Sequence, residues 1–202
     1  MTKQEKFIKE IGPIIQTEAT SRGYKFPSAI IAQACLESAF GTSQLSAIYH
    51  NYFGLKCGVY WHGQSVNMKT REEYHPGHST IIKDNFRVYR DMEEGVKGYF
   101  DFISTQRYAS LKNAVSSKDY LEKIKAAGYA TSSTYVKNVF AVVEKYGLDK
   151  YDGVTTSTDT KVDIDKIARD VIAGKYGNGD VRRQKLGSLY DVVQKRVNEM
   201  LK

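Results

Sequence analysis

The sequence of 202 residues has no apolar run near the roughly 18 residues that cross a bilayer, which excludes a membrane-spanning helix. Its two cysteines, Cys35 and Cys57, are too few for a disulfide framework and lack metal-site spacing. The start, MTKQEKFIKE, has charges where a signal peptide needs an apolar core, so we expect no cleaved signal. The four histidines lie in predicted loops without i, i+4 helical pairing, so we predict neither a metal nor another cofactor.

What the chain does have is an ordinary globular composition with a basic balance. Hydrophobic residues make up 41% and charged residues 26%, which is typical of a protein that buries a core. The net charge of +7 suggests an anionic partner, and nucleic acid, a membrane surface and bacterial wall polymer all qualify. The 15 tyrosines suit a carbohydrate groove, where rings stack on sugars and hydroxyls form hydrogen bonds, although half-buried core positions would use them equally well.

The stretch PSAIIAQACLESAFG, residues 27–41, predicts a short central helix. Pro27 suits a first helical turn and Gly41 suits a helix end. Ile30, Ala34 and Glu37 follow at i, i+4 and i+7, which puts a carboxylate on the stripe expected to face the interior. A carboxyl group removed from water has a raised pKa and can donate a proton near neutral pH. The alternative is a glutamate that reaches solvent or pairs with a lysine.

The patterns on either side predict a mainly helical chain with one hairpin. Thr2 and Glu5 fit a capping box at the start of a helix, which Pro13 should kink or break. The loop at residues 42–62 is rich in aromatic rings and could form a substrate wall or a satellite core. Alternation over residues 63–90, with turn residues at 74–77, predicts a β-hairpin. Helical spacing then predicts helices near residues 92–103, 108–115, 118–127 and 134–146.

Composition changes after residue 152. Residues 153–160, GVTTSTDT, are small and hydroxylated and predict a flexible linker. Residues 161–202 then show three short helical patterns around a tiny apolar set, which favours a binding module over an enzyme. The predicted organisation is therefore a domain at 1–152, a linker at 153–160 and a three-helix module at 161–202.

Five strings in order resemble the glucosaminidase domain of glycoside hydrolase family 73 over about residues 5–152. They are AQACLESAFG, NYFGLKCG, SVNMKTREEYHPG, FRVYRDMEEGVKGYFDFI and GYATSSTYVKNVFAVVEKYGLDKYD. The resemblance implies an α+β, mainly helical fold, with a lysozyme-like catalytic lobe and a small β-hairpin lobe. It also implies hydrolysis of the β-1,4 bond after N-acetylglucosamine in peptidoglycan, without a cofactor.

The same resemblance implies roles for individual residues. Glu37 matches the general acid that protonates the leaving oxygen. The second acidic residue corresponds to Glu73, or to Glu72 because the segment carries one extra residue, and it either activates water or stabilises positive charge. Tyr129 matches a tyrosine near the N-acetyl group, and Tyr135 follows in the same motif. The candidate substrate-binding residues in the ring-rich loop are Asn51, Phe53, Gly54, Tyr60 and Trp61.

The last forty residues resemble the CW-seven type of cell-wall-binding repeat, a three-helix bundle that binds a muropeptide. The matching strings are IDKIARDVIAGKYGNGDVRRQKLG and YDVVQKRVNEML. Asp180, Arg182 and Arg183 are the candidate ligand contacts, because paired charges suit peptide carboxylates. The alternative is an exposed helix face without a ligand, which would carry the same pattern of charged residues.

Together these patterns predict a bacteriolytic endoglucosaminidase that acts as a monomer on peptidoglycan and has no nucleic-acid partner. Without a signal peptide, we expect a phage or prophage endolysin, made in the host cytoplasm and released to the wall through a membrane pore. The alternatives are a muramidase or lytic transglycosylase, which uses the same lobe and one glutamate, and a non-catalytic wall-binding protein.

Overall fold

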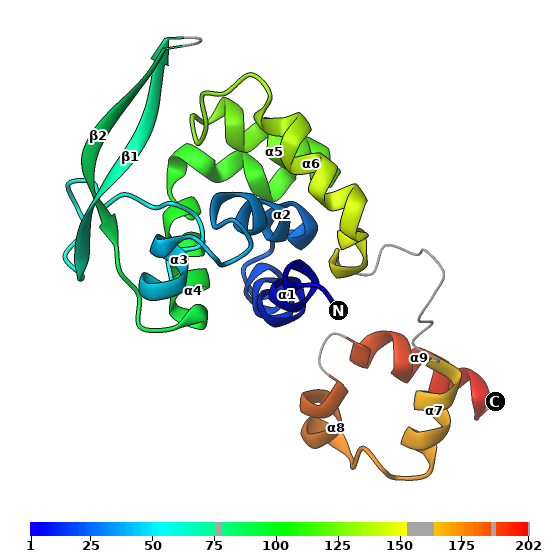
Figure 1. Cartoon of the computed structure of the whole chain (residues 1–202). Helices are drawn as coiled ribbons and strands as arrows, with labels where there is room; N and C mark the ends of the chain where they lie inside the picture. Colours follow the sequence, from blue (N-terminus) through cyan, green and yellow to red (C-terminus); the bar gives the residue numbers. More distant parts are fainter. Residues whose placement is uncertain (76–77, 153–163, 187–188, 202) are drawn as a thin grey trace. The chain divides into compact units, whose positions relative to one another are not determined.

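The computed structural model describes residues 1–75, 78–152, 164–186 and 189–201, and for residues 71–75, 78–80, 166, 184 and 191 it describes the backbone alone. The chain divides into two compact units, Met1–Thr155 and Thr156–Lys202. The first unit is mainly helical with one antiparallel hairpin (Figure 1), which confirms the predicted fold class. No helix in the described ranges has the length and apolar character that a membrane crossing requires.

Helix α1, Lys3–Ser21, begins at the predicted capping box. The Thr2 backbone N–H donates to the Glu5 carboxylate at 2.7 Å, and the Glu5 N–H donates to the Thr2 hydroxyl at 3.2 Å. Of the two outcomes predicted at Pro13, a kink or a break, the break is wrong, because the helix continues through this exposed residue. Pro13 removes one backbone donor on the solvent side, while the opposite face, which includes Ile11 and Ile15, is fully buried and holds the helix in place.

Helix α2, Pro27–Glu37, is the centre of this unit. Its first nine residues are all buried, and it packs against α1 and against α5 (Ser117–Ala126), α6 (Tyr135–Tyr146) and the 3₁₀ helix η2 (Leu148–Tyr151). Asp152 holds its N-terminus by accepting from the Ser28 N–H at 2.7 Å and from the Ser28 hydroxyl at 2.6 Å. The helix ends four residues before the predicted Gly41, because Ala39, Phe40 and Gly41 are all left-handed.

The hairpin pairs β1, Ser65–His75, with β2, His78–Arg87. Their register runs from Ser65 opposite Arg87 to Glu73 opposite Ser79, with an irregularity between Glu73 and His75. The predicted turn at residues 74–77 includes positions 76 and 77, which lie outside the described residues. The preceding loop joins the base of the hairpin through the Cys57 N–H, which donates to the Asn85 carbonyl at 2.8 Å.

The rest of this unit completes an aromatic core. The prediction of a loop throughout residues 42–62 is wrong at its start, where helix α3 (Gln44–Tyr49) forms behind the Ser43 cap. Helix α4 (Met92–Ile103) matches its prediction, and η1 (Gln106–Asn113) is a 3₁₀ helix that overlaps the helix predicted near residues 108–115. The core contains a stack of Phe53 on Tyr99, with ring centroids 4.0 Å apart. Gly147 ends α6 in a left-handed conformation. Both cysteines are free thiols, Cys35 buried and Cys57 half-buried.

The second unit contains α7 (Ile164–Ile172), α8 (Gly179–Leu186) and α9 (Tyr190–Met200). Among the residues described there, five form a buried core, namely Ala168, Val171, Leu186, Val193 and Val197. Arg196 on α9 donates to both carboxylate oxygens of Asp165 on α7, at 2.7 and 3.2 Å, which ties these two helices together. The predicted linker at 153–160 lies outside the described residues.

Candidate active site

Glu37 is the last residue of α2, at the point where the buried helix reaches the surface. The residue is solvent-accessible, so the prediction that it faces the interior is wrong. The periodicity misplaced it because α2 is apolar on every side and therefore has no single buried stripe. Its carboxylate forms no hydrogen bond or ion pair with any described residue. The surrounding protein nevertheless removes enough water to raise the pKa of Glu37 to about 7.

Three residues distant in sequence approach this carboxyl group. A Cβ placed on Gly54 would lie 3.8 Å from Glu37 Oε2, so the glycine leaves one side of the carboxyl open. Burial raises the pKa of Tyr129 and of Tyr135, and the nearby Glu37 charge raises both further. The Tyr129 hydroxyl donates to the Phe53 carbonyl at 2.9 Å, which fixes the ring beside the loop that carries Gly54. The site therefore combines one accessible acid with two neutral phenols.

A buried hydrogen-bond network lies in the core next to the site and holds Tyr135 in place. Gln33, one helical turn before Glu37, is fully buried, and its amide donates to the Tyr135 hydroxyl at 2.7 Å. Its carbonyl oxygen accepts from the Tyr99 hydroxyl at 2.8 Å, and Tyr99 shares a 2.9 Å hydrogen bond with Tyr120. Helices α2, α4, α5 and α6 each contribute one member. This network was not predicted from the sequence, although a glutamine inside an otherwise apolar helix is a signal of one.

Of the predicted substrate-binding residues whose side chains the structure describes, Gly54 and Tyr135 lie at Glu37. Asn51 is buried and its amide bonds the backbone of Leu55 and Arg87, each at 2.9 Å, so it shapes the loop. Phe53 is buried and contributes its carbonyl to Tyr129. Two further candidates lie elsewhere on the loop, Tyr60 being 90% exposed and Trp61 lining a separate pocket.

The second carboxylate stays a prediction. The backbone pairs Glu72 with Thr80 and Glu73 with Ser79 near the tip of the hairpin. The side chains of both glutamates lie outside the described part of the structure, so the distance from either carboxyl to Glu37 is not defined.

In the second unit, the three predicted contact residues belong to α8. Arg182 donates to the Gly177 carbonyl, the Asn178 amide and the Gln194 amide at 3.0–3.1 Å, and thereby holds the preceding turn and α9. The Arg183 guanidinium lies 4.6 Å from the centre of the Tyr190 ring. Asp180 is exposed in the first turn of α8. Most of the N–H donors of Arg182 are therefore already used within the unit.

Comparison with protein families gives two matches. The family model described as glucosaminidase, mannosyl-glycoprotein endo-beta-N-acetylglucosaminidase, matches residues 12–148, and the CW_7 repeat matches residues 165–201. The exo-glucosaminidase LytG of Bacillus subtilis is 35% identical over 150 residues, which cover 71% of this chain and 52% of the relative. A probable N-acetylmuramidase of Lactococcus lactis is 32% identical over 166 residues, which cover 77% of this chain and 37% of the relative. The chain thus spans about half or less of these relatives' lengths.

Two solved structures share the fold of the first unit. The catalytic domain of the autolysin Auto from Listeria monocytogenes superposes with a TM-score of 0.64 at 31% identity, covering 75% of this chain and 89% of that domain. A truncated glycoside hydrolase domain of FlgJ from Salmonella typhimurium gives a TM-score of 0.56 at 26% identity, covering 71% of this chain and 97% of that domain. The chain therefore belongs to the glucosaminidase family, glycoside hydrolase family 73, and carries a CW_7 repeat at residues 165–201.

Proposed function

We propose that the protein is an endo-β-N-acetylglucosaminidase that cleaves the β-1,4 bond after N-acetylglucosamine in bacterial peptidoglycan. The observation that carries this proposal is the Glu37 carboxyl group, which is accessible, unpaired with any described residue and has a pKa of about 7. An acid of this kind keeps its proton near neutral pH and delivers it to the leaving glycosidic oxygen.

The neighbouring groups suit the same reaction. Tyr129 and Tyr135 stay neutral, because burial and the Glu37 charge raise the pKa of both hydroxyls. The Tyr135 hydroxyl can therefore donate a hydrogen bond to a sugar, and the Tyr129 oxygen, whose proton goes to the Phe53 carbonyl, can accept one, without adding negative charge beside the acid. As the glycosidic bond breaks, positive charge develops at the anomeric carbon, and Glu73 or Glu72 from the hairpin supplies the opposing carboxylate, either by activating water or by stabilising that charge.

The deciding experiment measures lysis of purified walls and identifies the new ends. Wild-type protein should reduce the turbidity of a wall suspension and create N-acetylglucosamine reducing ends within the strands. The variant Glu37→Gln keeps the shape of the side chain but has no proton to donate, so its rate should fall by about 100-fold or more. Glu122→Gln, a change at an exposed glutamate of α5, is the matched control. Full activity of Glu37→Gln would refute the proposal, as would a wild-type protein that binds walls without cutting them.

A muramidase activity is the second candidate, since one of the relatives is a probable N-acetylmuramidase. The same digest separates the two activities, because a muramidase leaves N-acetylmuramic acid at the new reducing end and a lytic transglycosylase leaves its anhydro form. Release of single sugars from chain ends would instead indicate an exo-acting enzyme, the activity named for LytG.

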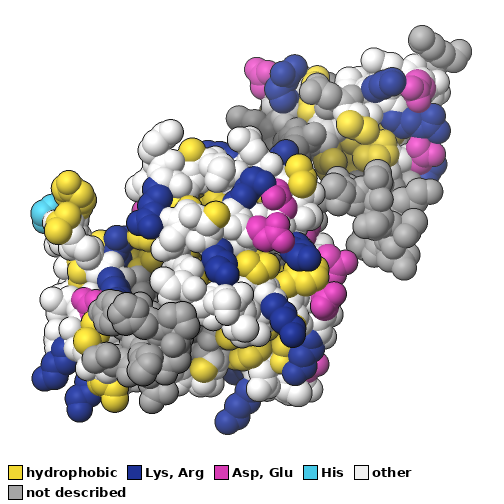
Figure 2. All heavy atoms as spheres, turned by 90° about the horizontal axis from the view of Figure 1, so that it is seen from above, with side chains coloured by type: hydrophobic (Ala, Val, Ile, Leu, Met, Phe, Trp, Pro, Cys, Tyr) yellow, Lys and Arg dark blue, Asp and Glu magenta, His cyan; other side chains and the backbone are white. Residues whose placement is uncertain are grey.

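We also propose that the second unit binds the wall and raises the local concentration of the first unit on its insoluble substrate. The CW_7 match supports this role, and the net charge of +7 favours an anionic wall. Nucleic acid is the weaker partner, since on the face seen in Figure 2 the Lys and Arg side chains are scattered instead of forming one continuous basic surface. Deleting residues 156–202 should weaken sedimentation with walls while hydrolysis of short soluble glycans is retained.

The biological role that we propose is that of a phage or prophage endolysin, made in the cytoplasm and released to the wall through a membrane pore. A catalytic unit followed by a wall-binding repeat supports it. Expression inside a susceptible bacterium should lyse the cells only when a pore-forming protein is co-expressed, and lysis without the pore would contradict this role.

A further inference from the structure

Asn51 is a buried polar residue at the start of the loop that reaches Glu37, and only 2% of its surface is exposed. One N–H of its side-chain amide donates to the Leu55 carbonyl at 2.9 Å, and the other donates to the Arg87 carbonyl at 2.9 Å. The amide oxygen accepts from the Leu55 N–H, also at 2.9 Å. Both donors and the acceptor of this amide are thus used within the protein.

The two bonds between Asn51 and Leu55 close a turn at residues 51–55. Within this turn, Gly54 has a left-handed backbone with a φ of +64°, and a Cβ placed on it would lie 3.8 Å from Glu37 Oε2. The preceding residue, Phe53, is buried and anchors the turn in the aromatic core. The turn that Asn51 closes is therefore one wall around the Glu37 carboxyl group.

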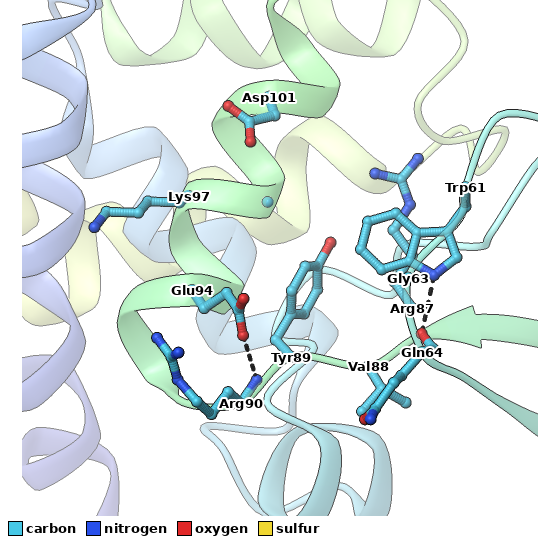
Figure 3. A pocket seen from close by; sticks show the side chains of 11 residues that line it. Trp61, Gly63, Gln64, Arg87, Val88, Tyr89, Arg90, Glu94, Lys97 and Asp101 are labelled. Carbon is cyan, nitrogen blue, oxygen red and sulfur yellow. Dashed lines mark hydrogen bonds between the residues drawn. The ribbon is translucent and has the colours of Figure 1, made fainter.

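The third bond of Asn51 joins this turn to the end of β2. Arg87, which accepts that bond, is the last residue of β2, and its N–H donates to the Leu55 carbonyl at 3.0 Å. Its Nε donates to the Lys56 carbonyl at 3.0 Å, and its guanidinium lies 4.8 Å from the centre of the Trp61 ring. Figure 3 shows the Trp61 and Arg87 side chains next to each other at this end of the strand. Arg87 is thus held through its backbone and its side chain, and Asn51 attaches the turn to it.

The partners of Asn51 require two donors and one acceptor on a short side chain. Aspartate has the same shape but no N–H donor, whereas serine supplies one acceptor and alanine supplies nothing. Without the amide, the buried Leu55 N–H loses its acceptor and the Arg87 carbonyl loses a donor, so opening of the turn to water becomes favourable. Because the turn is a wall of the site, its opening hydrates the Glu37 carboxyl group.

Glu37 responds to the position of this wall through its pKa. Burial raises the pKa of Glu37 to about 7, and its carboxylate has no hydrogen bond or ion pair with any described residue. In the described part of the chain, the titratable groups that face it are Tyr129, which follows α5, and Tyr135 on α6, and burial keeps both neutral. Residues 51–55 include no charged side chain, so the turn acts on Glu37 by excluding water.

We propose that Asn51 is a positioning residue for the proposed hydrolysis, because it holds the Gly54 turn against Glu37 and attaches that turn to the end of β2. The inference rests on the proposed function. β2 pairs with β1, which carries Glu72 and Glu73, so Asn51 joins the wall of the catalytic acid to the hairpin that holds both candidates for the second carboxylate. Asn51 thereby keeps the two sides of the site together without contacting the substrate.

The test measures the pKa of Glu37 by NMR titration of full-length protein labelled with ¹³C at the glutamate carboxyl carbons. The Glu37 signal is the one that Glu37→Gln lacks. The wild type should titrate near pH 7, and Asn51→Ala should titrate lower by about one pH unit or more, because the carboxyl group is hydrated. That shift should lower kcat/KM about fivefold at pH 7 and hardly at all at pH 5, where Glu37 is protonated in both proteins. A general loss of structure would lower the rate at both pH values.

Ser28→Ala is the matched control. Ser28 is also fully buried, and its hydroxyl donates to Asp152 at 2.6 Å at the opposite end of α2 from Glu37. This variant should lose stability but keep the wild-type pKa of Glu37 and the wild-type pH profile. Asn51→Ser is a milder variant, because its hydroxyl can still accept from the Leu55 N–H, and it should lower the pKa of Glu37 by a smaller amount.

The inference is overturned if folded Asn51→Ala keeps the wild-type pKa of Glu37, or if Ser28→Ala lowers that pKa equally. If Asn51→Ala does not fold, Asn51→Ser decides by the same criterion. Because the NMR titration needs no turnover, absence of hydrolysis by the wild type would refute the proposed function separately.

Discussion

The rate of glycan cleavage should fall with rising pH around the pKa of Glu37. With a pKa of about 7, roughly nine-tenths of the Glu37 carboxyl groups are protonated at pH 6 and about one-tenth at pH 8. An ordinary glutamate, with a pKa of 4.5, would be only about 3% protonated at pH 6. Desolvation thus increases the supply of catalytic acid about thirtyfold at that pH. We therefore expect kcat/KM to decline about tenfold for each pH unit above 7.

The assay is initial-rate release of reducing ends from a soluble glycan between pH 4 and 9, with stability checked at each pH. Because the folded-state pKa of Glu37 is raised, ionisation should also lower the free energy of unfolding as pH rises from about 4.5 to about 7, and Glu37→Gln should abolish that dependence. The matched variant Glu122→Gln should keep the wild-type profile. A descending limb centred near pH 4.5 would refute the reasoning, because it would mean that the carboxyl group is fully hydrated.

Three further predictions concern groups around the site. Gln33→Leu leaves the buried Tyr99 hydroxyl without its acceptor and should lower the free energy of unfolding by about 2–3 kcal/mol, measured by urea denaturation. A loss below about 0.5 kcal/mol would show that the network contributes little to stability. Gly95→Ala places a Cβ 2.1 Å from the His50 carbonyl oxygen and should lower the free energy of unfolding by about 1–3 kcal/mol, although alanine favours a helix. An unchanged melting temperature in thermal unfolding would show that the backbone at His50 moves away to make room. Burial raises the pKa of Asp152 to about 6, so the free energy of unfolding of the wild type should fall between about pH 4 and pH 6, relative to that of Asp152→Asn. Parallel plots of unfolding free energy against pH for the two proteins would contradict this.

Much of the fold followed from local patterns. The capping box at Thr2, the helix start at Pro27 and the glycine that ends α6 at Gly147 each act within a few residues, so the sequence reveals them directly. Periodicity failed where burial was uniform. All residues from Pro27 to Cys35 are buried, so no stripe indicates direction, and Glu37 turned out to be accessible at the helix end.

The composition of the site depended on packing that local patterns do not contain. Tyr129 and Tyr135 lie more than ninety residues after Glu37, and only the family motif pointed to them. Gln33, which bonds Tyr135 and Tyr99, lies in the string AQACLESAFG, but that string did not indicate its role, which depends on four helices meeting. Trp61 shows the opposite error, because an aromatic residue in a loop suggested a wall of the Glu37 site. In the structure, Trp61 instead lines the separate pocket that includes Arg87 and Tyr89.

The two thiols of this chain differ enough in environment to serve as a built-in label site. Burial raises the pKa of the Cys35 thiol to about 12, which keeps it protonated and unreactive in the native state. Cys57 is half-buried in the loop that bonds to the base of the hairpin, where an alkylating reagent can reach it. Maleimide chemistry on the unaltered protein should consequently attach a single dye beside the β-lobe. Movements of that lobe on a living cell wall could then be followed without any engineered cysteine.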